Sequence, residues 1–243
     1  KETYDFYKNI YVVASQQNLH FQQWFKVIEL MGYDWAKDCV HVPFGLVSME
    51  DGTMSTRQGR VVFLEDVLNR AVEKNVTTEN IDETAHDVGV GAVVFNELSN
   101  YRIKDYVFSW DKVLNFEGET GPYVQYTHAR ACSILRRAGE DTVKAAKKGF
   151  DTSWITGESA HHLIKLLYAL PEVIKEAGEK YEPSIVTRHI VDIAQGFNKF
   201  YHDEHILVED EKEKTAKVAL VLAVQTAIKN GLGLLGMKAP EKM

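Results

Sequence analysis

The residues best suited to chemistry lie in one nine-residue loop, 51–59, with the sequence DGTMSTRQG. Glycines near both ends of the loop let the backbone approach a ligand closely. Ser55, Thr56 and Arg57 offer hydroxyl and guanidinium donors, which are the groups that hold phosphate, while Met54 can anchor the loop on apolar surface. These residue types fit a mobile phosphate clamp, and by themselves they fit a plain surface hairpin equally well.

The segments before this loop predict a parallel strand–helix–strand unit. Ile10–Ala14 is β-branched and aromatic and predicts a short buried strand, and His20–Met31 is an amphipathic helix. Val40–Val47 predicts a second strand, and two strands joined by a helix run parallel. Ligands of such sheets bind at the carboxyl ends of the strands. Both Ser15–Gln17 and the loop follow a strand end, so we expect them to share a ligand crevice.

A second candidate surface lies on the predicted helix 122–138. Tyr123, Arg130 and Arg137 recur every seven residues, with Tyr126 beside them, and on a helix this spacing drifts only about 20° per step. An aromatic and basic face suits RNA, because bases stack on tyrosine and arginine pairs with phosphate. The spacing alone favours the simpler alternative, a solvated helix whose arginines cover the edge of the core.

Two smaller groups are weaker candidates. Phe197, Phe200 and Tyr201 share one helical face, which is typical of core packing, and Tyr201 is the member whose hydroxyl favours solvent. Gln17 and His20 follow the first strand, where an amide can orient a polar substrate and an imidazole can face ribose or phosphate. Taken singly, each is more typical of an ordinary polar residue than of a ligand contact.

Composition excludes several classes of protein. The sequence contains no apolar run of the roughly 20 residues that cross a membrane. The net charge of −7 argues against a generic nucleic-acid binder but leaves room for a local basic face. Cys39 and Cys132 lie far apart without metal-ligand spacing, which favours free thiols in a reducing compartment over a disulfide. The histidine spacing gives no support for a metal site.

Helical periodicity dominates from Leu64 onward. We expect helices over 65–74, 84–102, 122–138, 159–179, 183–203 and 211–230. The last of these is apolar on nearly every side, which places it at the centre of a bundle. The segment Glu117–Pro122 contains two glycines and a proline, and it predicts a domain boundary.

Four segments together resemble arginyl-tRNA synthetase, a class I aminoacyl-tRNA synthetase, nearly from end to end. Tyr11–Phe21 is similar to a strand and substrate segment of that family, and His41–Val47 with Met54–Arg57 resembles its signature-loop region. Gly118–Tyr126 resembles the start of its helical domain, and Leu234–Met243 resembles its C-terminus. Their order along the chain matches too.

The resemblance implies a mainly α fold. A helical-bundle anticodon-binding domain, 118–243, would follow the C-terminal remnant of a Rossmann-like α/β catalytic domain, 1–117. It also implies the reaction, in which arginine is activated with ATP, assisted by Mg²⁺, and then transferred to tRNA(Arg). We therefore expect a cytoplasmic monomer whose partners are arginine, ATP and tRNA(Arg), without membrane attachment.

The same resemblance implies roles for individual residues. Gln17 would hold the substrate arginine, and Ser55 and Arg57 would act on the pyrophosphate during catalysis. The residues expected at ATP are His20, Phe44, Gly45, Val47 and Met54. The residues expected at the tRNA anticodon are Tyr123, Arg130, Phe197, Tyr201 and Met243. Phe200 is expected to stay in the core, and no metal ligand is assigned.

The sequence departs from the family pattern in three ways. Thr53 stands where the signature loop usually has its first lysine, and Arg57 serves as the second basic residue. The other class I signature, a His-Ile-Gly-His-like segment, is not in this chain, and the connection near Asn75 is short. We therefore expect the C-terminal part of a synthetase that is inactive in adenylation on its own. The alternatives are a non-catalytic tRNA-binding module and a nucleotide-binding regulator that kept the loop.

Overall fold

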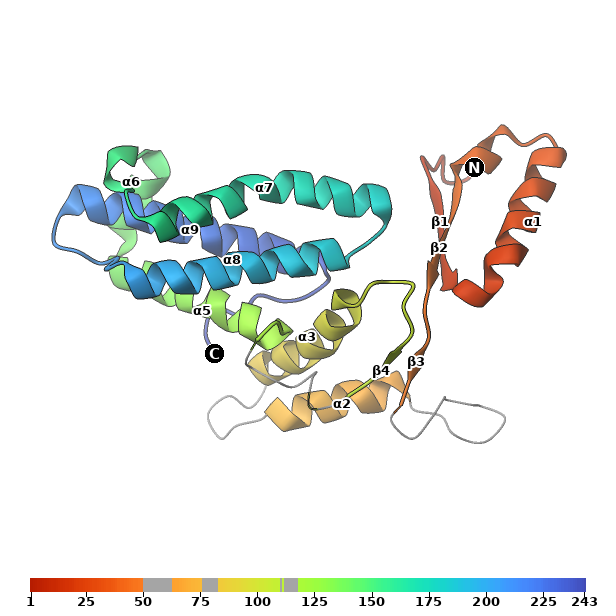
Figure 1. Ribbon diagram of the computed structural model, residues 1–243, viewed down its shortest axis with the longest axis horizontal. Helices are drawn as coiled ribbons and strands as arrows, with labels where there is room; N and C mark the ends of the chain where they lie inside the picture. The colour runs from red at the N-terminus through yellow and green to blue at the C-terminus, as the bar shows by residue number, and fades with distance from the viewer. Residues whose placement is uncertain (50–62, 76–82, 110, 112–117) are drawn as a thin grey trace. The chain divides into compact units, whose positions relative to one another are not determined.

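The protein forms two compact units in the computed structural model, which describes residues 1–49, 63–75, 83–109, 111 and 118–243 (Figure 1). The N-terminal unit contains the described residues of Lys1–Val61 together with Asn100–Ser109. The helical unit contains those of Val62–Ser99 and Trp110–Met243. The structure therefore groups the two helices before residue 100 with the C-terminal bundle.

The N-terminal unit is built on a parallel strand–helix–strand motif, as the sequence predicted. Strand β1, Asn9–Ala14, pairs in parallel with β2, Cys39–Phe44, and helix α1, Asn18–Leu30, connects them. Ala14 lies opposite Phe44, so both strands end at the same edge of the sheet. One-turn 3-10 helices, Ser15–Gln17 and Asp34–Asp38, flank α1.

The predicted second strand is divided at Gly45. β2 ends at Phe44, and a two-residue strand, β3 (Val47–Ser48), then pairs in parallel with β4 (Tyr106–Val107). The division has a steric cause, because a Cβ at Gly45 would lie 2.5 Å from the carbonyl carbon of Lys104. The amide of Gly45 also donates to the carbonyl of Arg102 at 2.9 Å. Glycine thus allows two chain segments to touch here.

Among the described residues, side chains of α1 cover one face of this small sheet. Tyr11 lies 4.9 Å from Trp24 of α1, ring centroid to ring centroid, and Phe21 stacks on His41 at 4.2 Å. On β1, Val12 is 64% exposed. Parallel strands are normally buried on both faces, so the exposed apolar side chains mark a face that suits a further layer of structure.

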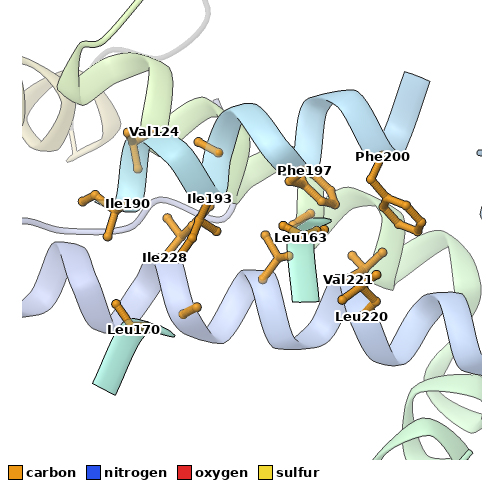
Figure 2. Close-up of a cluster of buried hydrophobic side chains, with 14 of the residues drawn as sticks. Val124, Leu163, Leu170, Ile190, Ile193, Phe197, Phe200, Leu220, Val221 and Ile228 are labelled. Carbon is orange, nitrogen blue, oxygen red and sulfur yellow. The ribbon is translucent and has the colours of Figure 1, made fainter. Parts of the chain in front are cut away.

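The helical unit consists of long antiparallel helices around one core. In chain order its helices are α2 Leu64–Asn75, α3 Glu83–Ser99, α5 Gly121–Ala138, α6 Glu140–Lys148, α7 Glu158–Lys180, α8 Ser184–Asp203 and α9 Glu211–Leu234. α9 packs against α5, α6, α7 and α8, as its apolar sequence predicted. Figure 2 shows Val221 and Ile228 of α9 facing Leu163, Ile193 and Phe197 across this core.

Helix ends follow recognisable local signals. The Thr120 hydroxyl accepts from the amide of Tyr123, and Pro122 occupies the first turn of α5. Gly139, with φ of 86°, separates α5 from α6. Helix α6 carries little hydrophobic periodicity and was not predicted, because its residues are mostly charged and only Ala146 is buried. None of the helices within the described ranges combines the length and hydropathy needed to span a bilayer.

Candidate functional site

A groove on the helical unit brings together several of the predicted RNA-binding residues. It lies between α5, α8 and the last residues of the chain and has a volume of about 880 Å³. That volume is in the range of sites that enclose small molecules. The lining residues are Tyr126, Ala129, Arg130, Ser133, Arg136, Asn198, Tyr201, His202, Lys242 and Met243.

Arg130 is held in place at the centre of this groove. Its Nη1 donates to Oδ1 of Asn198 at 2.7 Å, and the Asn198 amide donates to the hydroxyl of Tyr123 at 2.8 Å. The guanidinium carbon lies 5.0 Å from the ring centroid of Tyr126 and 5.5 Å from that of Tyr201. Both of these rings are more than 40% exposed. The arrangement presents an oriented cation between two accessible aromatic faces.

The groove is locally basic although the chain is acidic. Arg130, Arg136 and Lys242 all line it, and none of the lining side chains is acidic. A cluster of this sign attracts phosphate even when the net charge of the chain is −7. The structure therefore supplies the local basic face that the composition left open.

The prediction that Phe197 contacts the anticodon needs correction. Its side chain is 0% exposed, and Figure 2 shows it in the core near Leu163 of α7. It is buried because the 197, 200 and 201 positions span an arc of α8 that turns from core to solvent, and Phe197 lies on the core side. Its ring centroid is 6.5 Å from that of Tyr201. Phe197 therefore packs on the core side of the exposed Tyr201 ring. Phe200 is 1% exposed and lies in the core as expected.

Tyr123 also differs in detail from its expected role. It is half-buried, packs against the core, and accepts a hydrogen bond from Asn198, so it braces the partner of Arg130. Tyr126 has the more accessible ring of α5. The seven-residue spacing placed Tyr123 and Arg130 on one face of α5, where both contact Asn198, but it did not reveal which tyrosine is exposed.

The end of α9 directs the chain back toward α5. Gly236 has φ of 74°, and the amide of Met237 donates to the carbonyl of Leu232 at 2.9 Å. This is the bond of a Schellman motif, which reverses the chain after a helix. Met237 itself is buried. The residues that follow, 238–243, are called the C-terminal tail below.

Side chains of α5 hold the C-terminal tail by its main-chain carbonyls. Gln125 donates to the carbonyl of Lys238 at 3.0 Å, and Arg136 donates to that of Glu241 at 3.2 Å. Nδ1 of His128 lies 2.9 Å from the carbonyl oxygen of Pro240. These contacts lead the tail along α5, and its last residues reach the groove beside Arg130.

Three of the residues predicted for arginine and ATP lie at or just after the carboxyl ends of β1 and β2. Gln17 and His20 are exposed and follow β1, and Phe44 ends β2 with an exposed ring. Gly45 and Val47 come next, and the amide of Gly45 is already bonded to Arg102. Gln17, His20 and Phe44 therefore lie at or just after the ends of strands that end at the same edge, whereas Val47 belongs to β3 in the other sheet.

The predictions for the signature loop concern residues that the structure does not describe. Met54, Ser55 and Arg57 lie outside the described residues, as does the short connection after Asn75. The proposed roles of these three residues therefore remain predictions.

Sequence reasoning missed three residues that organise the groove: Gln125, His128 and Asn198. A signal for Asn198 exists, because it lies three residues before Tyr201 and so shares its helical face. The sequence analysis followed the aromatic side of that stripe and overlooked its polar side. Gln125 and His128 read as ordinary helix residues, since their partners are more than 100 positions away.

Two family models match different parts of the chain, and the first part includes α2 and α3, which the structure groups with the helical unit. A family model described as the DALR anticodon binding domain matches residues 124–243. A second, described as the catalytic domain of class I (R) tRNA synthetases, matches residues 1–110. Residues 111–123 lie between the two matches, and the segment Glu117–Pro122 falls in this interval.

Individual relatives match the whole chain. An arginine–tRNA ligase of Halothermothrix orenii is 60% identical over 251 residues, and one of Clostridioides difficile is 57% identical over the same length. Each alignment covers 100% of this chain and 44% of the relative, so the chain spans less than half the length of these proteins. The solved arginyl-tRNA synthetase of Thermus thermophilus is 30% identical with a TM-score of 0.84, covering 97% of this chain and 41% of that one. The chain therefore belongs to the arginyl-tRNA synthetase family and corresponds to the C-terminal part of its members.

Proposed function

We propose that the whole protein is an arginine–tRNA ligase and that this chain supplies its anticodon-binding unit. The relatives are named arginine–tRNA ligases, which favours the enzyme over a non-catalytic tRNA-binding module. Within the chain we place the functional boundary between 117 and 118. The observation that carries the proposal is Arg130, oriented by Asn198 between the rings of Tyr126 and Tyr201.

This arrangement suits an unpaired RNA loop. Single-stranded bases stack on exposed aromatic rings, and a guanidinium pairs with phosphate or stacks on a base. A groove of about 880 Å³ has room for a base turned out of its stack. We propose that Arg130, Tyr201 and Met243 contact the anticodon loop, with Tyr126 as a further stacking ring. Tyr123 and Phe197 hold these groups in position.

The N-terminal unit fits the end of a class I catalytic domain. The carboxyl edge of a parallel sheet is the usual place for a nucleotide. We propose that Gln17 holds arginine there and that His20, Phe44, Gly45, Val47 and Met54 contact ATP. Ser55 and Arg57 would stabilise charge on the departing pyrophosphate.

Mg²⁺ would reach the full enzyme with ATP. Within the described residues no group of three or more His, Cys, Asp or Glu side chains is placed to hold a metal ion.

The compartment and the oligomeric state complete the proposal. We propose a cytoplasmic location, supported by two cysteines that are free and buried, as a reducing compartment favours. We also propose a monomer, which rests on the family resemblance alone.

Competition for tRNA(Arg) tests the proposal. An anticodon stem-loop of tRNA(Arg) is expected to displace labelled full-length tRNA(Arg) from this chain with a similar inhibition constant. A duplex that mimics the acceptor stem should compete at least about tenfold less well, because it offers no unpaired bases to stack. Equal competition by both RNAs would reject the assignment of the helical unit to the anticodon.

A further inference from the structure

His128 is a buried histidine whose two ring nitrogens both have partners. Nδ1 faces the carbonyl oxygen of Pro240 at 2.9 Å, and Nε2 faces the side-chain amide nitrogen of Gln225 at 3.0 Å. A carbonyl oxygen only accepts, so Nδ1 carries the proton. Nε2 then accepts a hydrogen bond from the Gln225 amide. The two contacts together select the neutral ring with its proton on Nδ1.

The surroundings of His128 keep it neutral. Its side chain is 0% exposed, and burial lowers the pKa of the imidazole. The groups that face it are Gln225 and Lys229 of α9, Cys132 of α5 and Glu241 of the C-terminal tail. The hydrogen bond to the Pro240 carbonyl and the charge of Glu241 raise the pKa, Lys229 lowers it, and the net change is downward.

The path of the tail beside His128 is built into the helices. Gln125 lies one turn before His128, is 0% exposed, and donates to the carbonyls of both Asp87 and Lys238. Space for its amide depends on Gly91, where a Cβ would lie 2.8 Å from the Gln125 nitrogen. The bonds to the tail reach main-chain carbonyls, so they fix the course of the backbone. Lys242 and Met243, which follow, line the groove.

We infer that His128 is a positioning residue for the groove, because it latches the C-terminal tail to α5 and thereby sets Met243 and Lys242 beside Arg130. The inference rests on the proposed function, since the groove is where tRNA would bind. His128 has no place among the groove-lining residues, so it acts through the tail.

Two substitutions of His128 distinguish the effect of its hydrogen bond to Pro240 from the effect of filling the buried space. In His128→Asn the side-chain amide occupies the place of Nδ1 and can still donate to Pro240. In His128→Gln the amide reaches the place of Nε2, and the bond to Pro240 is lost. We expect His128→Gln to raise the Kd for tRNA(Arg) about 3- to 10-fold, the cost of one buried hydrogen bond. His128→Asn should stay within about twofold of the natural protein.

The methyl resonance of Met243 reports the tail directly. In the natural protein and in His128→Asn it should be shifted by the neighbouring rings of the groove. In His128→Gln it should narrow and move to the random-coil position. Gln225→Leu, a change at a partly exposed site, should give the same change to a smaller degree and covers the case in which His128→Gln does not fold.

A double-mutant cycle decides whether the effect passes through the tail. Deleting residues 239–243 should raise the Kd, and adding His128→Gln to that deletion should change the Kd no further. An unchanged Met243 resonance in His128→Gln and Gln225→Leu would overturn the inference. So would an equal loss of affinity from His128→Gln with and without the tail. If Arg130→Ala binds tRNA as the natural protein does, the proposed function fails, while the Met243 resonance still decides the latch.

Discussion

Replacing Arg130 with alanine is expected to raise the Kd for tRNA(Arg) by about 5- to 150-fold, which corresponds to about 1–3 kcal/mol. The substitution removes the cation that Asn198 orients and leaves the rings of Tyr126 and Tyr201 without the group between them. The slope of log K against log salt should also become shallower by about 0.7–0.9, the contribution of one phosphate contact. Fluorescence titration across a salt series measures both quantities.

Arg137→Ala is the matched control for this prediction. Arg137 lies on the same helix and was predicted on the same face, but it is exposed and does not line the groove. Arg137→Ala removes one positive charge, as Arg130→Ala does. The general electrostatic attraction between the chain and RNA therefore falls equally in the two variants. We expect the Arg137 variant to change the Kd by less than about threefold. An equal loss of tRNA affinity in the two variants would mean that Arg130 contributes only through its positive charge and makes no specific contact with the RNA.

The second large effect is on adenylation. We expect the chain alone to catalyse arginine-dependent pyrophosphate exchange at less than about one thousandth of the rate of the full-length enzyme, with tRNA(Arg) present in both assays. Catalysis of this kind depends on several donors fixed around the developing charge, and each is worth about 10²–10³ in rate. The described residues form two sheets of two strands each, and the β1–β2 sheet has an exposed apolar side chain, Val12, on one face, so we expect much of the surrounding catalytic structure to come from the rest of the enzyme.

The full-length enzyme provides the control for adenylation. There, Arg57→Ala should lower kcat for exchange by about 10²–10³, since it removes a donor to the pyrophosphate. Exchange by the chain alone at a rate near that of the full-length enzyme would refute the prediction of an inactive part.

The N-terminal unit could be predicted because its signals are local. The β-branched run at Ile10–Ala14 and the amphipathic helix after it indicate a parallel crossover without any long-range information. The division of the second strand could not be predicted in this way. It depends on the approach of Lys104 to Gly45, two residues far apart in the sequence, and β4 is too short to show alternation.

The groove was predicted in part for a similar reason. Spacing placed Arg130 on an exposed face of α5, and the apolar character of α9 placed that helix in the core. Asn198 bonds Arg130 across 68 positions, and His128 meets the tail across 112, so neither contact leaves a local pattern. Phe197 and Tyr201 show what helical spacing cannot predict. The spacing identifies residues that share a side of the helix, but it does not show which of them are buried and which are exposed.

Nuclease footprinting of tRNA(Arg) bound to this chain is the most direct test that the helical unit binds the anticodon loop. We expect protection of the anticodon-loop nucleotides and no change in cleavage of the acceptor stem. In Arg130→Ala the loop protection should weaken at protein concentrations that saturate the natural chain. Protection confined to the acceptor stem, or loop protection unchanged by Arg130→Ala, would contradict the assignment of this groove to the anticodon.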